Sequence, residues 1–193
     1  MQFPSGTTAD LLKLIAEHPL AWLVTHGDQG FDATPLPLLA ETDAEGALVA
    51  LLGHCSRSNA QVRALRDNPT AVALFSGPEA YISPALVSKP QWVPTWNFTV
   101  AAISVEVEFI DDETEAAVAR LTHGMEAGQP QPWTFAEAGP RIAQMLPRII
   151  GFRAHVTSID ARFKLGQDES AQTVAELIAG VSDRGLATWM QRM

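Results

Sequence analysis

The sequence predicts a mainly β protein with α-helices, an antiparallel barrel flanked by helices, and three observations lead to this prediction. Short apolar or alternating segments recur along the 193-residue chain, as is typical of β-strands. Helical patterns lie between and after these segments without strict alternation, which disfavours a doubly wound parallel sheet. Two prolines interrupt one strand pattern, so that strand belongs at an edge or a bulge. Roughly six short strands of this kind fit a closed or nearly closed barrel.

The N-terminal segment predicts a helix followed by a strand. Residues 7–17 carry a helical apolar stripe, and Thr7 with Asp10 forms a capping box, a pattern that begins many helices. Residues 20–26 predict a strand, and 27–30 predict a turn.

Pro35 and Pro37 lie within the second predicted strand, residues 31–39. Proline cannot donate a ladder hydrogen bond, so this strand should have unpaired backbone groups with which a ligand could pair. Residues 47–52 are apolar throughout and predict a central strand.

The next segment predicts a helix and a buried strand. A capping box of Ser58 and Gln61 predicts a helix over 58–67. The strand is expected over 71–75, ending at the Phe-Ser-Gly-Pro sequence.

Apolar and polar residues alternate in two segments of the second half, which predicts strands with one wet face. Three helical patterns accompany them, the second begun by another capping box. The strands are expected over 101–109 and 148–159, and the helices over 112–123, from Thr134 and Glu137 to about 146, and from 170 onward with a break near Gly180. We therefore expect a barrel domain over 1–169 and a C-terminal helical segment over 170–193.

The composition excludes several classes of protein. The one cysteine, Cys55, cannot form an internal disulfide or a multi-cysteine zinc site, and it suits a reducing, cytoplasmic setting. The five histidines have no metal-binding spacing. No apolar run approaches the roughly 20 residues of a membrane span. The net charge is −9, and the 13 Lys and Arg residues do not cluster, which opposes direct nucleic-acid binding.

Arg57 is the strongest candidate for a binding residue. It precedes a predicted helix N-terminus, where backbone N–H groups and a guanidinium together favour a phosphate. The residues therefore point to a phosphorylated cofactor, although an ordinary surface arginine beside a helix cap has the same local pattern. His54 is either a packed or hydrogen-bonded structural histidine or a catalytic one.

Aromatic residues surround a proline-rich loop further along the chain. Tyr81, Trp92 and Trp96, with the amide of Asn97, would suit an aromatic ring ligand by stacking and hydrogen bonding. Alternatively, Trp96 fills the core. No nucleophile-elbow or phosphate-loop motif occurs, and the sequence places no general acid or base, so catalytic residues stay undefined.

Taken together, these motifs resemble the PaiB-type family of FMN-binding negative transcriptional regulators, which have a split β-barrel similar to that of the pyridoxamine phosphate oxidase group. The most specific are Val-Pro-Thr-Trp-Asn and Gly-His-x-x-Arg-x-Asn. The resemblance runs from residue 18 nearly to residue 180. The matching motifs are 18–21, 33–37, Gly53-His54 with Arg57 and Asn59, Phe75 with Gly77-Pro78, 81–84, 93–97, Pro132-Trp133, 150–152, and Lys164-Leu165 with Gln167.

The resemblance implies a homodimer that binds the small molecule FMN. The apolar runs and the histidine spacing described above predict no membrane association and no metal. The resemblance also implies that one group of residues holds the FMN phosphate, a second runs along the flavin, and a third closes the site across the subunit interface. These groups are His54, Arg57, Ser58 and Asn59; Thr34, Pro35 and Leu36; and Thr95, Trp96, Asn97, Lys164 and Gln167.

The resemblance further implies a negative transcriptional regulator that acts through bound flavin and affects gene expression indirectly. The alternative is an FMN-dependent oxidoreductase or flavin reductase with an unknown small substrate, and the fold does not choose between them. A barrel without cofactor is a third reading.

Three motifs depart from the family pattern. Ala85 and Leu86 replace a Trp-Tyr pair, Ala60 replaces a proline, and Gly166 and Asp168 replace a serine and an asparagine. The last two changes remove hydrogen-bond donors, so we expect FMN binding to be weaker or altered.

Overall fold

The computed structural model describes residues 6–27 and 30–192, in which seven strands form one antiparallel sheet ordered β2-β1-β5-β6-β7-β4-β3. The edge strands β2 and β3 are separated in sequence only by Leu38, which is fully buried. The sheet must therefore curl until its two edges approach, which makes the barrel. The strands are β1 Leu20–Gly27, β2 Gly30–Pro37, β3 Leu39–Thr42, β4 Leu48–Ser56, β5 Thr70–Ile82, β6 Thr95–Phe109 and β7 Ile149–Lys164.

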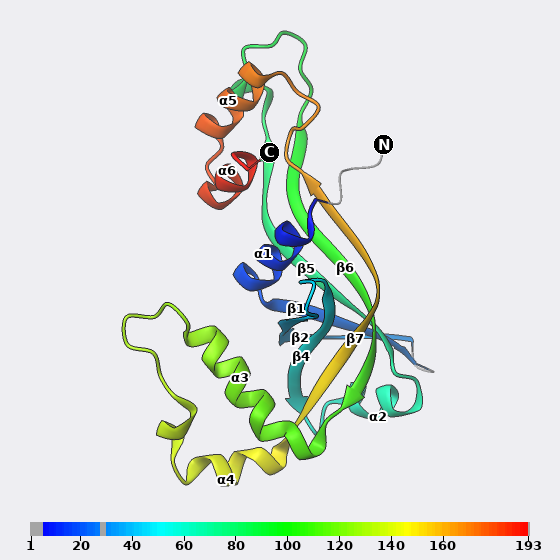
Figure 1. Ribbon diagram of the computed structural model, residues 1–193. Helices are drawn as coiled ribbons and strands as arrows, with labels where there is room; N and C mark the ends of the chain where they lie inside the picture. Colours follow the sequence, from blue (N-terminus) through cyan, green and yellow to red (C-terminus); the bar gives the residue numbers. More distant parts are fainter. Residues whose placement is uncertain (1–5, 28–29, 193) are drawn as a thin grey trace.

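Helices cover the barrel at separate places (Figure 1). α1 packs Leu11, Leu14 and Ile15 into the core, α3 covers the outer side of β4 and β7, and α5 and α6 lie beside the far ends of the long strands. The helices are α1 Thr8–Glu17, α2 Ala60–Asp67, α3 Thr114–Glu126, α4 Arg141–Met145, α5 Ala171–Gly180 and α6 Arg184–Met190.

Three strands extend well past the barrel and form an arm. β5, β6 and β7 contain 13, 15 and 16 residues. β5 continues through Gly77-Pro78 by means of a bulge between Ser76 and Glu79. A Cβ at position 77 would collide with Thr99 and Leu14, so the close packing of β5 on α1 requires glycine there.

Several expectations are confirmed. The Thr7–Asp10 capping box begins α1, β2 with its two prolines is an edge strand, and Ser170 begins α5, which a short turn separates from α6. The predicted turn over 27–30 falls partly outside the described residues.

Other expectations are wrong in their bounds. Asn59, not Ser58, is the N-cap of α2, because its side chain accepts from the N–H of Gln61 while the Gln61 side chain points into the core. Gly77-Pro78 does not end β5. The Thr134 capping box starts only a short 3-10 segment, because the chain turns at Gly139 with a positive φ of 53° before α4.

Among the helices of the described residues, none is long and apolar enough to cross a membrane.

Candidate functional site

The turn between β4 and α2, residues 56–59, presents polar groups to solvent. The Ser56 and Ser58 hydroxyl oxygens lie 2.8 Å apart, and the Arg57 N–H donates to the Arg148 carbonyl at 2.9 Å. The side chain of Asn59 caps α2 at the N–H of Gln61. The turn thus combines hydroxyls, a guanidinium and the first turn of a helix, a set of groups that suits an anion.

Asn59 also ties this turn to the edge strand β2. Its amide donates to the Thr34 hydroxyl at 3.0 Å. Gln61, which is 2% exposed, donates to the carbonyls of Leu23 and Asp32 at 2.9 and 3.2 Å. The predicted residues on β2 and those around Arg57 are therefore brought together into one group.

The Arg57 guanidinium already has an anionic partner. Its Nη1 lies 2.5 Å from Oδ1 of Asp111, and Arg66 approaches the other oxygen of this carboxylate at 3.5 Å. The Arg57 side chain is 39% exposed, so its remaining N–H groups can still reach a ligand. Asp111 is a residue that the sequence analysis missed, since nothing local links it to position 57.

His54 lies behind the turn on β4, half-buried beside Gly151. Its Nδ1 is buried and has no hydrogen-bond partner among the described residues. Burial lowers the pKa of the His54 imidazole, so the ring is neutral at pH 7. Burial likewise raises the pKa of the neighbouring Cys55 thiol to about 11, which keeps it protonated and a poor nucleophile.

The second group of predicted residues lies on the arm. Thr95 and Asn97 begin β6, and the Lys164 ammonium at the end of β7 donates to the Thr95 hydroxyl. Together they line a pocket of about 430 Å³. Gln167, in contrast, folds back on its own turn, where its side chain bonds the backbone of Phe163 and Leu165.

Trp96 faces the other side of β6. It is 51% exposed, and its ring meets that of Tyr81 edge-on at 6.1 Å. Asn97 is 2% exposed and points toward α5 and α6, which together form the helical cap. Neighbouring residues of a strand point to opposite faces, so the Trp96 ring and the Asn97 amide do not line one pocket within a single chain.

The two groups lie at opposite ends of β6. The strand contains 15 residues, which at about 3.3 Å each corresponds to roughly 50 Å along its path. Thr95 opens the strand, whereas Asp111, the partner of Arg57, follows its last residue. This separation along the strand disfavours contact of one flavin mononucleotide with both groups within one chain.

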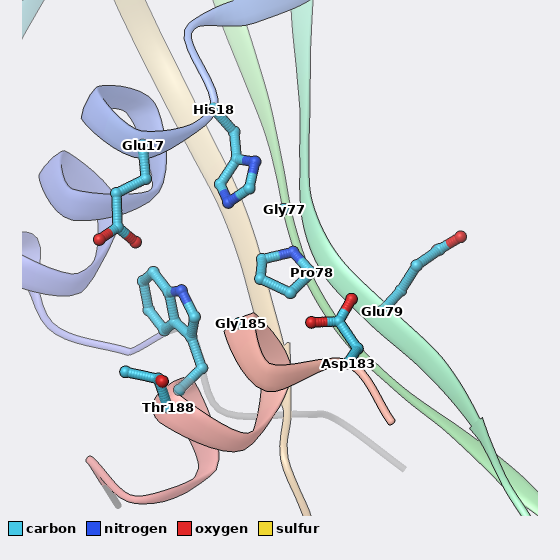
Figure 2. A pocket seen from close by; sticks show the side chains of 9 residues that line it. Glu17, His18, Gly77, Pro78, Glu79, Asp183, Gly185 and Thr188 are labelled. Atoms are coloured by element: carbon cyan, nitrogen blue, oxygen red, sulfur yellow. The ribbon is translucent and has the colours of Figure 1, made fainter. Parts of the chain in front are cut away.

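A different cavity, of about 540 Å³, lies between α1, β5 and α6 (Figure 2). Glu17, Glu79 and Asp183 line it together with Trp189. The negative charges of the three carboxylates disfavour a phosphate in this cavity. None of the predicted FMN-binding residues lines the cavity. The exposed turn 56–59 is chemically better suited to a phosphate than this acidic cavity.

An antiparallel split barrel with a cationic, hydroxyl-rich turn at a helix start defines the class of the molecule. Residues 1–158 match the family described as "Putative FMN-binding domain", and the chain belongs to this family. FMN, the cofactor that the resemblance implied, is thereby confirmed at the level of the family.

The chain is also similar to one further protein in sequence and to solved structures in fold. The protease synthase and sporulation protein PAI 2 of Bacillus subtilis (strain 168) is 25% identical over 170 residues, covering 87% of this chain and 81% of that protein. The fold is similar to that of a FAD and haem binding protein from Mycobacterium smegmatis, with a TM-score of 0.64, 16% identity, and 94% and 81% of the two chains covered. A conserved hypothetical protein from Mycobacterium tuberculosis gives a TM-score of 0.60 at 14% identity over 89% and 96% of the chains.

The residues present fit the cofactor. The exposed Arg57 guanidinium and the hydroxyls of Ser56 and Ser58 offer donors to a phosphate. The buried Nδ1 of His54 still lacks a partner among the described residues. Gly166, where the family has a serine, adopts a φ of +88°, a conformation that glycine takes without strain, so the structure accounts for that departure locally.

Proposed function

We propose that the protein is a homodimer that binds FMN between its two copies. One copy supplies the turn 56–59 for the phosphate, with Thr34, Pro35 and Leu36 along the flavin. The other copy supplies Trp96 from the exposed side of its arm. The observation that carries this proposal is the separation of the predicted residues to the two ends of β6.

The outer face of the sheet supports the homodimer. Trp22 and Leu74 are paired across β1 and β5, and they are 52% and 41% exposed. Together with Val100 and Ala102 they line an apolar groove of about 320 Å³. Large exposed aromatic and aliphatic side chains on one face are typical of a subunit interface.

As to role, we propose a negative transcriptional regulator that works through bound flavin and through another protein, in the cytoplasm. The B. subtilis relative is named a protease synthase and sporulation protein, and we take the mention of sporulation as support for a regulatory role. The net charge of −9 opposes direct contact with nucleic acid. The alternative is an FMN-dependent oxidoreductase or flavin reductase, for which the pocket at Asn97 would offer a place for a second small molecule.

A subunit-complementation experiment tests the shared site. Arg57→Ala and Trp96→Ala should each weaken FMN binding. Arg57→Ala removes one or two charge-assisted hydrogen bonds, about 1.5–3 kcal/mol each. When the two variants are mixed and allowed to exchange subunits, each mixed dimer contains one fully intact site, so tight FMN binding should return for a fraction of the chains. No recovery despite proven exchange would contradict the shared site.

Asp111→Asn gives the matched control for Arg57. It removes the anion that competes for the guanidinium, so FMN affinity, measured by fluorescence titration, should rise or stay unchanged while that of Arg57→Ala falls. Equal losses in both variants would indicate that the ion pair only supports the fold.

The Arg57→Ala variant also distinguishes the regulator from the oxidoreductase when it is tested in cells. If the protein regulates through flavin, Arg57→Ala should reproduce the transcript changes of a gene deletion. Rapid bleaching of the bound flavin by NAD(P)H, with multiple turnovers on an added acceptor, would instead favour the oxidoreductase.

A further inference from the structure

The pocket on the arm is formed by parts of the chain that are distant in sequence. Its walls come from the loop before β6, the start of β6, the end of β7 and α5, and its volume of about 430 Å³ lies in the range of small-molecule sites. Most of its C-terminal wall, including Lys164, Gly166 and Leu177, lies beyond residue 158, where the family match ends.

The deepest polar group of this pocket is the amide of Asn97. The residue is 2% exposed, and its Nδ2 approaches only the Met190 sulfur, at 3.8 Å. Its Oδ1 receives no hydrogen bond from the described residues. A primary amide offers two donors and an acceptor, and a thioether is a weak acceptor. The buried Asn97 amide therefore has unused donor and acceptor capacity next to the pocket.

An oriented aromatic ring forms another wall. The Trp92 Nε1 donates to Glu169 at 2.7 Å, and the same carboxylate binds Lys89 at 2.9 Å. These bonds lower the pKa of Glu169, which stays ionised and fixes the indole. Val93 and Leu177 add apolar surface.

The charges lining this pocket balance. Lys89 and Lys164 are matched by Asp168 and Glu169, so the formal sum is zero. This balance distinguishes the pocket from the cationic turn at Arg57 and gives no preference for a phosphate.

We propose that this pocket binds a neutral, planar heteroaromatic ring that carries an amide-like edge, the chemistry shared by nicotinamide and the nucleobases. An amide side chain pairs with such an edge through one donor and one acceptor, as asparagine does with adenine. The ring packs against Trp92. This site is independent of the FMN phosphate site at Arg57.

Nicotinamide and nicotinate form a matched pair of probes, because they differ only in carboxamide against carboxylate. Calorimetric titrations on the FMN-saturated protein should show saturable binding of one nicotinamide per chain. Nicotinate should bind at least about tenfold more weakly than nicotinamide, because its carboxylate cannot donate a hydrogen bond to Oδ1 of Asn97. Equal binding of both probes, or no saturable nicotinamide binding, would overturn the proposal.

Variants locate the binding. Asn97→Leu should weaken nicotinamide binding by about tenfold or more, and Trp92→Leu should also weaken it. Gln131→Leu, an amide-to-apolar change in the exposed loop after α3, should leave it unchanged. Asn97→Leu could disturb the packing of α5 and α6, so Trp92→Leu serves as a second variant. An unchanged melting temperature would show that Trp92→Leu is folded. Unchanged binding in both well-folded variants would contradict the site, as would competition between nicotinamide and FMN.

Discussion

At one end of β6 the turn 56–59 is exposed, carries one arginine and is rich in hydroxyls, and at the other end the Asn97 pocket is recessed and balanced in charge. The first lies against the barrel, whose sheet is continuous and whose core includes Phe152 and Leu38. The second depends on α5 and α6, which pack on three extended strands. This difference teaches that the barrel can hold a charged ligand without the cap, whereas the pocket exists only while the cap is folded.

The largest effect is expected at the barrel end. Phe152 is 1% exposed and stands opposite Gly53, where an added Cβ would come within 2.6 Å of Leu38. Phe152→Ala removes most of this packing and should lower the free energy of unfolding by about 3–5 kcal/mol. Chemical denaturation should show this loss of stability. FMN binding and nicotinamide binding in the pocket on the arm should both become weaker. A loss below about 1 kcal/mol would contradict the tight packing.

The corresponding change on the arm is Trp189→Ala. The Trp189 ring stacks on Phe163 at 5.5 Å and is 2% exposed, so its removal should cost about 3 kcal/mol. The comparison predicts that hydrogen exchange accelerates in α5 and α6 while β4 and β7 near Gly151 stay protected. Uniform acceleration across both ends would show that the arm and barrel unfold as one unit.

A smaller effect is expected at Glu41, which bridges β3 to β7 and α3. Its carboxylate accepts hydrogen bonds from Arg153 and Arg120, both at 2.6 Å. Burial pushes its pKa up, but these two arginines more than offset that and hold the pKa of Glu41 below 4.5. The stabilisation is present above pH 4.5 and is lost as pH falls through the lower, folded-state pKa.

Glu41→Gln should therefore cost about 1–3 kcal/mol at pH 7. The difference between the variant and the wild type should shrink below about pH 4. Thermal melts at several pH values measure this, and a difference that stays constant with pH would contradict the role of the Glu41 charge.

The smallest effect is expected at His54. Because burial lowers the pKa of His54 below 6.5 in the folded chain, the unfolded chain takes up this proton first as the pH falls. Stability should decline below pH 6.5 and level off below the folded-state pKa. His54→Gln should remove this component, so its melting temperature should depend less on pH between 7 and about 5. A variant with the same pH dependence as wild type would contradict this assignment.

Local patterns in the sequence determined much of the fold. The Thr7–Asp10 box fixed where α1 begins, and the prolines at 35 and 37 placed β2 at an edge. These features follow from local hydrogen bonding and periodicity, which the sequence displays directly. The Gly-His-x-x-Arg-x-Asn motif likewise identified the turn that links Asn59 to Thr34.

Only the tertiary structure decided how the candidate residues are grouped. Strand register places Trp96 and Asn97 on opposite faces of β6, and the length of that strand separates both from Arg57. Asp111 meets Arg57 although they are 54 positions apart in sequence. Gly77-Pro78 reads locally as a strand end, but packing of β5 on α1 and its pairing with β6 carry the strand through it. Such contacts depend on which distant segments pair and how far they extend, and local propensity carries no information about either.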